Sequence, residues 1–492
     1  MRAIQAERRA VDTKESNPGP SVRWALISLS LSMLLASLGT SIANVGLPTL
    51  ALAFGASFQQ VQWVVVAYLL AITTLIVSVG RLGDIIGRRR LLLAGIATFT
   101  VASVLCGLAP TLGLLITARV VQGLGAAIMM ALTMACVGEA VPKSQTGSAM
   151  GLLGTMSAIG TALGPTLGGI LIASWGWPAL FIVMAPLGVL ILALAHRFLP
   201  ADRRVAPAQR IVFDHAGTML LGLTLAAYAL AMTTGHGSFG PLNVALLISA
   251  ICGVGLFAIA ETKVSTPLIR LAIFRDPVLS AGFAMSALAT TVVMATLVVG
   301  PFYLSGALAL DAARVGLVMS TGPIVAALVG APAGRIIDRF GPPGMILVGL
   351  IAMAIGSAIL PLVPIRFGVV GYIAPLVVIT AGYALFQAAN NTAVMTKIQP
   401  DQRGVASGML NLSRNLGLIT GASVMGMLFA HGSTALKGTV IGPEAAAAGM
   451  RSTFIAGAAL VTVAATMAWA SRAKTQRSSP PHRALDNDSD HA

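Results

Sequence analysis

Two arginines lie where a strongly apolar chain rarely carries charge. Arg119 falls in the apolar stretch 111–138, and Arg414 falls in the stretch 402–430. A cation inside a bilayer costs at least ~2.5–3.5 kcal/mol on insertion scales, so each arginine is a candidate for binding or relaying a charged group. The alternative for each is a structural role, in which the guanidinium donates hydrogen bonds to helix ends or backbone carbonyls.

The composition around these arginines is that of a polytopic membrane protein. Of the 492 residues, 56% are hydrophobic and only 10% are charged, whereas soluble proteins carry about 25% charge. Apolar runs of roughly 20 residues recur along the chain, and each can cross a ~30 Å hydrocarbon layer. The net charge of +15 does not indicate nucleic acid, because the basic residues lie between the spans rather than in one patch.

Apolar runs between charged or Pro/Gly breaks predict fourteen spans. We expect them at 24–52, 60–80, 91–109, 111–138, 146–173, 178–199, 214–234, 242–262, 277–306, 312–334, 343–364, 366–396, 402–430 and 452–471. With both termini in the cytoplasm, only four of the 31 Lys and Arg residues fall outside and two lie within spans. This bias predicts a multi-pass protein of the cell membrane with two cytoplasmic termini.

The segment 24–38 follows a basic tail, as a cleaved signal peptide would, but its apolar run continues past residue 50 and favours a first span. The three cysteines also fall in apolar stretches, so we expect them to pack as small side chains without a disulfide.

A motif of two glycines and an aspartate occurs twice with one spacing. The stretch GRLGDIIGRRR (80–90) is repeated as GRIIDRFGPP (334–343), and GSAMG (147–151) is repeated as GVASG (404–408). Both copies of the first motif follow an even-numbered span, so the two halves have the same orientation. We therefore expect a cytoplasmic tail (1–23), a six-helix half (24–199), two inserted helices with flanking loops (200–276), a second six-helix half (277–471) and a second tail (472–492).

Several motifs, in order along the chain, resemble those of the major facilitator superfamily, and within it the fourteen-helix drug:proton antiporter branch. The resemblance runs from about residue 24 to 471, with smaller matches in NVGLP (44–48), QWVVVAYLL (62–70) and NLSRNLG (411–417). The three main motifs of the branch are G-x-L-x-D-x-x-G-R-[KR], R-x-x-Q-G and G-x8-G-x3-G-P-x2-G-G. The first motif is matched by Gly80, Leu82, Asp84, Gly87, Arg88 and Arg89. The second is matched by Arg119, Gln122 and Gly123. The third is matched by Gly151, Gly160, Gly164, Pro165, Gly168 and Gly169.

The resemblance implies an all-α membrane fold whose two pseudo-twofold halves rock about a site near the bilayer midplane. It further implies that the first motif is a conformational latch, formed by Gly80, Asp84, Gly87 and Arg88. Its second copy, at Gly334, Asp338 and Gly341, has prolines in place of the arginines. The alternative for the arginines is that they only anchor the topology.

The helix 5 motif marks exporters within the branch, where it implies a smooth helix that seals one side of the seam between the halves. Gly160, Gly164 and Gly168 recur every four residues and share one face of the helix. The alternative is close helix packing in lipid, which such small residues favour by themselves.

The family's proton-relay arginine corresponds to Arg119, and we expect a relay or substrate cavity formed by Arg119, Gln122, Arg414, Asn44, Gln62 and Tyr68. The chain departs from the family in helix 1, where LGTSIANVGLP has Gly39 at the position of the usual aspartate. All sixteen Asp and Glu residues fall in tails, loops or helix ends. No buried carboxylate is therefore indicated as a proton carrier.

These observations predict a monomeric secondary active exporter that moves small amphipathic molecules by alternating access, coupled to protons and without a metal or cofactor. The first alternative is potential-driven export of an organic anion or a specific metabolite, without a buried proton carrier. A less favoured alternative is a sensor or channel derived from a transporter. An enzyme is not expected, because no histidine and no carboxylate lies at the middle of a span. The chain also lacks a G-x4-G-K-[ST] phosphate loop, so ATP-driven pumping is not indicated.

Overall fold

The computed structural model describes residues 20–140, 146–202, 214–234, 240–264, 274–398, 403–434 and 442–478. Fourteen helical stretches in these ranges are long and apolar enough to cross a membrane. The helices of the first part are α2 (Pro20–Phe54), α3 (Phe58–Ile86), α4 (Arg88–Gly107), α5 (Leu112–Ala140), α6 (Thr146–Trp175), α7 (Ala179–Ile182) and α8 (Met184–Phe198).

The inserted helices are α9 (His215–Thr233) and α10 (Pro241–Lys263). The remaining helices are α11 (Pro277–Gly306), α12 (Ala312–Met319), α13 (Thr321–Phe340), α14 (Pro342–Ile359), α15 (Gly368–Lys397), α16 (Arg403–Thr420), a π-helical turn η6 (Gly421–Met425), α17 (Gly426–Thr434) and α18 (Pro443–Ser478). Two short 3-10 turns, η3 (Leu360–Leu362) and η4 (Ile365–Phe367), lie between α14 and α15.

Two helix boundaries differ clearly from the sequence prediction. The helix expected to end at residue 80 continues to Ile86, so the polar stretch after residue 80 is mostly helix and not loop. The final helix begins at Pro443 and not near residue 452. Its first turns hold Glu444 and a run of alanines, which favour a helix start even though they are not strongly apolar.

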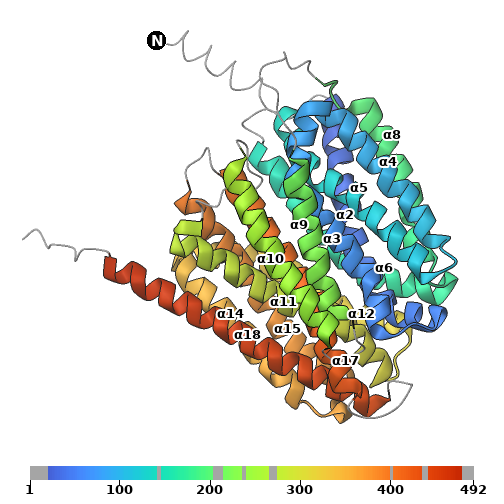
Figure 1. Ribbon diagram of the computed structural model, residues 1–492, viewed down its shortest axis with the longest axis vertical. Coiled ribbons are helices and arrows are strands. Elements are labelled where there is room, and N and C mark those ends of the chain that lie inside the picture. The colour runs from blue at the N-terminus through green and yellow to red at the C-terminus, as the bar shows by residue number, and fades with distance from the viewer. Residues whose placement is uncertain are drawn as a thin grey trace, which may run out of the picture.

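The helices form two groups of six spans. In the first half (α2 to α8), α2 packs against α5 and α6, and α4 packs against α5 and α8. In the second half (α11 to α18), α14 packs against α15, and α11 packs against α16 and α18. Figure 1 shows the first half in blue to green and the second in yellow to red, and their ribbons converge near α12 and α17.

The inserted pair joins both halves. α9 packs against α10, against α3 of the first half and against η6 of the second, and Figure 1 shows the pair in green across the junction. Toward α3, Trp63 Nε1 donates to Thr233 Oγ1 over 3.0 Å, and the Ser78 and Thr218 hydroxyls lie 2.7 Å apart. Toward the second half, the Tyr228 hydroxyl donates to Thr420 Oγ1 over 3.1 Å.

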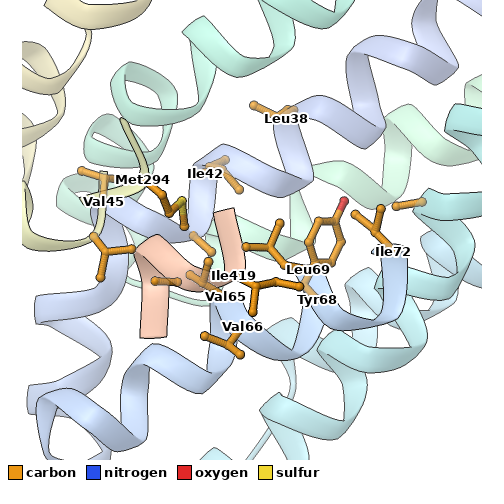
Figure 2. Packing of buried hydrophobic residues seen from close by; sticks show 14 of the residues in the cluster. Leu38, Ile42, Val45, Val65, Val66, Tyr68, Leu69, Ile72, Met294 and Ile419 are labelled. Atoms are coloured by element: carbon orange, nitrogen blue, oxygen red, sulfur yellow. The ribbon is translucent and has the colours of Figure 1, made fainter. Parts of the chain in front are cut away.

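A continuous apolar core crosses the seam, by which we mean the contact surface between the two halves. One cluster of buried side chains contains residues of both halves. In Figure 2, Met294 of α11 and Ile419 of α16 lie beside Val45 of α2 and Val65 of α3. Where α3 begins, the ring centroid of Phe58 lies 4.6 Å from that of Phe302 and 5.1 Å from that of Phe429. The halves are therefore tightly packed at the end of the bundle that holds the α2–α3 connection.

Candidate functional site

Arg119 lies fully buried inside the first half. From α5 it donates hydrogen bonds through Nε to the Val64 carbonyl of α3 over 2.8 Å and through Nη1 to the Gly39 carbonyl of α2 over 3.2 Å. Its Cζ lies 3.9 Å from the centroid of the Tyr68 ring, a cation–π contact. Nη2 has no hydrogen-bond partner within the described chain. The guanidinium thus ties three helices of the first half together.

Gln122 and Tyr68 extend this network. Gln122 Oε1 accepts from Arg119 Nη1, and Gln122 Nε2 donates to Ser103 Oγ of α4 over 2.7 Å. The Tyr68 hydroxyl donates to the Ala36 carbonyl of α2 over 2.9 Å. Three of the predicted site residues, Tyr68, Arg119 and Gln122, are therefore brought together, whereas Ser103 was not identified from the sequence because a single serine in an apolar helix carries no signal.

Gly39 shows how this chain accommodates the missing aspartate. A Cβ added at Gly39 would lie 2.9 Å from the Tyr68 hydroxyl oxygen and 3.0 Å from Phe99 Cζ. Tyr68 and Phe99 therefore occupy the space that a side chain at position 39 would need. Arg119 donates to the Gly39 carbonyl rather than to a carboxylate at this position. Within the described part of the chain, no carboxylate contacts Arg119.

Asn44 and Gln62 do not join the Arg119 network. Asn44 Nδ2 donates to the carbonyls of Thr40 and Ser41 in its own helix, over 3.3 and 3.2 Å. Gln62, on α3, donates from Nε2 to the carbonyl of Ala422 in the π-helical turn of the second half. Gln62 is therefore a seam residue, and π-helical turns of this kind are frequent at functional sites.

Arg414, the second buried cation predicted from the sequence, stands apart from Arg119. It lies on α16 of the second half, and its side chain is partly exposed. Its Nε is buried without a hydrogen-bond partner, and no ion pair or hydrogen bond to Arg414 is found in the described ranges. The described residues therefore do not show the structural alternative, in which Arg414 would donate hydrogen bonds to helix ends or backbone carbonyls.

The glycines of α6, the fifth span, fall into two sets. A Cβ at Gly160 would meet the Leu34 carbonyl, one at Gly164 would meet Ser41, and one at Gly168 would meet Val45. All three contacts are with α2 of the same half. The expectation that this glycine face lies at the seam is therefore wrong, because α2 and α6 pack backbone to backbone along it.

α6 contacts the second half through the face next to the one that carries Gly160, Gly164 and Gly168. A Cβ at Gly169 would lie 2.6 Å from the Ala312 carbonyl and 3.0 Å from Gly316 Cα in α12 of the second half, and one at Gly316 would meet the Pro165 carbonyl. The Thr166 and Ser320 hydroxyls are also in direct contact there. Pro165 and Gly169 thus lie at the seam. Of Gly151 only the helical backbone is described.

The latch motif spans the end of α3 and the start of α4, and its second copy spans the end of α13 and the start of α14. Gly87 alone links α3 to α4, with φ of 104°, and Gly341 links α13 to α14 with φ of 80°, so both positions require glycine. A Cβ at Gly80 or Gly334 would meet nothing within 4 Å, so these two glycines permit no close approach in this state. Asp338 is exposed, and the side chain of Asp84 lies outside the described residues.

Asp202, which the sequence analysis did not single out, is the carboxylate that meets this motif. It follows α8, and it accepts from the backbone N–H groups of Arg89 over 2.8 Å and Arg90 over 3.2 Å at the start of α4. An anion at a helix N-terminus is favourable. Arg89 in turn donates to the His196 carbonyl. Arg88 is the first residue of α4.

Comparisons with known proteins agree with this architecture. The chain matches the sequence model of the Major Facilitator Superfamily over residues 29–422. It is 30% identical to the riboflavin transporter RibZ of Clostridioides difficile over 84% of this chain and 89% of that protein. It is 31% identical to the multidrug resistance protein Stp of Mycobacterium tuberculosis, over 82% and 75%, and 28% identical to the multidrug efflux pump LfrA of Mycolicibacterium smegmatis, over 85% and 83%.

Solved structures share the fold. An inward-facing, unoccupied bacterial homologue of the human lysosomal transporter Spinster superposes with a TM-score of 0.68 at 16% identity, over 94% of this chain and 100% of that chain. A D-xylose–proton symporter superposes with a TM-score of 0.67 at 15% identity, over 91% and 97%. With fourteen candidate spans arranged as two halves and an inserted pair, the chain belongs to the major facilitator superfamily of membrane transporters.

Proposed function

We propose that this transporter exports small amphipathic molecules from the cell by alternating access, in exchange for protons. The observation that carries the proposal is the contact of α6 with α12, where Gly169 and Gly316 bring the two backbones together. Small residues let helices from different halves pack closely without interlocking side chains. Such a surface can separate and re-form as the halves rock.

The direction and the substrate class follow from the helix 5 motif and from the relatives, of which two are named as a multidrug resistance protein and a multidrug efflux pump. We place both termini in the cytoplasm, as the distribution of Lys and Arg favours. The packed end of the seam is then the external end. The chain works as a monomer in the bilayer in this proposal.

A second candidate is potential-driven export of an organic anion, and the environment of Arg119 favours it. The cation is bound by carbonyls, by Gln122 and by Tyr68, with no carboxylate of the described chain in contact to carry a proton. An inside-negative potential drives anions outward by ~2.3 kcal/mol per charge per 100 mV. Export of this kind needs no buried proton carrier.

Respiring inside-out vesicles test both candidates, because their lumen is acidic and positive. Uptake of an amphipathic dye beyond that of vesicles lacking the protein supports export. For a monovalent cationic dye, one-for-one proton exchange moves no net charge, so nigericin, which collapses the pH gradient, should stop uptake and valinomycin, which collapses the potential, should not. Anion export predicts the reverse. Uptake equal to that of control vesicles for cationic, neutral and anionic dyes would contradict the proposal.

A further inference from the structure

The guanidinium of Arg414 lacks a hydrogen-bond or ion-pair partner among the described residues. Arg414 lies within an apolar span, and its Nε is buried. A buried cation without a partner is costly, and in membrane proteins it faces water, a ligand or a neighbouring polar group. Arg119 differs, because carbonyls and an amide already occupy most of its donors.

Two asparagines share the face of α16 that carries Arg414. Asn411 and Asn415 are four residues apart, with Arg414 three residues after the first, so the three side chains lie together. Both asparagines are partly exposed, and neither amide has a hydrogen bond to the described chain. The face therefore presents a guanidinium and two amides whose donors have no acceptor among the described residues.

This polar face points away from the inserted pair. On the other side of α16, Leu416 packs against a buried cluster that includes Leu221 and Leu225 of α9, and Thr420 accepts from Tyr228 of α9. α16 also packs against α3 of the first half and α11 of the second. Asn411, Arg414 and Asn415 therefore lie on the side of α16 opposite its contact with α9, and we assign this side to the interior between the halves.

Building on the proposed function, we propose that Asn411, Arg414 and Asn415 bind the anionic group of the substrate, which is an amphipathic organic anion such as a carboxylate or sulfonate. A guanidinium and two amide NH2 groups together match the several acceptor oxygens of such a group. No described carboxylate forms an ion pair with Arg414. The apolar body of the substrate packs against the surrounding apolar side chains.

Two naphthalene ions of opposite charge test the assignment. Inside-out vesicles are given 2-naphthalenesulfonate or trimethyl(2-naphthyl)ammonium, which share one ring system and cross bilayers poorly. The wild-type protein should transport the sulfonate in preference. Arg414→Gln should lower sulfonate transport about tenfold or more, because it removes a charge-assisted hydrogen bond. Arg414→Lys keeps the charge and should retain part of the rate.

Two further variants keep the test decisive. Asn415→Leu removes one donor but no charge, so it should lower sulfonate transport by a smaller factor even if Arg414→Gln folds poorly. Arg314→Gln is the matched control, because Arg314 is exposed and its one ion pair with a described residue is that with Asp311 at 3.4 Å; it should transport as the wild type does.

Equal sulfonate transport by the wild type and by well-folded Arg414→Gln would overturn the assignment. Wild-type transport of the ammonium ion alone would overturn it too, while leaving the proposed export function intact. Transport of neither ion would count against the export function itself, and the assignment would fall with it.

Discussion

The two halves share a backbone plan but use their buried arginines in different ways. In the first half, Arg119 is wholly buried and holds α2, α3 and α5 together through carbonyls and Tyr68. In the second half, Arg414 is partly exposed and none of the described residues binds it. A charged side chain in a transporter span is therefore not by itself evidence of a substrate contact. Its hydrogen-bond partners decide between a structural role and a binding role.

The backbone plan itself is repeated more fully than the side chains. Gly160 meets the Leu34 carbonyl of α2, and in the second half Gly421 meets the Thr291 carbonyl of α11. Each half therefore packs its fifth helix against its first through glycine on a carbonyl. Small residues are retained where backbones touch, whereas the polar residues have diverged between the halves.

Replacing each arginine by leucine should have the largest effect and the sharpest contrast. Arg119→Leu removes the hydrogen bonds from the guanidinium to the Val64 and Gly39 carbonyls and to Gln122, and bonds to a charged group contribute about 1.5–3 kcal/mol each. We expect little protein in a monodisperse peak on size-exclusion chromatography. Arg414→Leu breaks no described bond and should elute as the wild type does. Equal losses for both variants would remove the distinction between the two halves.

At the seam the halves should behave alike. Gly169→Leu and Gly316→Leu each place a side chain into the other helix, so both should insert correctly but lose nearly all export. Gly154→Leu, on the same α6 helix, is the matched control, because a Cβ there meets nothing within 4 Å. Cysteine accessibility from the two sides should show the first two variants unable to close the packed end. Active Gly169→Leu protein would show that this contact is not part of the transport cycle.

The latch motif should again divide the halves. We propose that Asp84 acts in the change between states, so Asp84→Asn should fold normally and lose most export. Asp338 is exposed, and prolines follow it where arginines follow Asp84, so Asp338→Asn should have a milder effect. Initial export rates normalised to protein amount measure the difference. Normal export by Asp84→Asn would leave only the topology-anchor role for this segment.

The smallest contrast concerns the two linking glycines. Alanine at Gly87 or Gly341 must adopt a positive φ in a sparsely populated backbone region, which costs of order 1–3 kcal/mol. At Gly87 the new methyl group would also displace the Asp202 carboxylate, whereas at Gly341 the nearest atom is Pro343 Cδ at 3.9 Å. Gly87→Ala should therefore lower the midpoint of thermal unfolding further than Gly341→Ala. The opposite order would mean that Asp202 contributes nothing to the α4 start.

The sequence predicted the spans, the repeated halves and the inserted pair because these follow from apolar length and motif spacing. It also indicated Tyr68, Arg119 and Gln122 through one local motif, and the structure brings them together. It misplaced the face of Gly164 and Gly168, because glycine spacing shows that a helix packs closely but does not show which neighbour it meets.

Other parts of the site depend on distant partners and could not be predicted. Asp202 meets the start of α4 across more than a hundred residues of chain, and Gln62 meets the carbonyl of Ala422 in a π-helical turn of the other half. Neither partner has a local pattern. The same holds for the contrast between Arg119 and Arg414, which look equivalent as charges in apolar stretches.

Thermal unfolding of purified protein, with and without 2-naphthalenesulfonate, tests the division between the two arginines most directly. A ligand that binds only the folded state raises the melting temperature. We predict that the anion stabilises the wild type, that Arg414→Gln melts like the wild type without anion but gains nothing from it, and that Arg119→Gln melts lower but still gains. Undiminished stabilisation of Arg414→Gln by the anion, or a wild-type melting temperature for Arg119→Gln, would contradict this account.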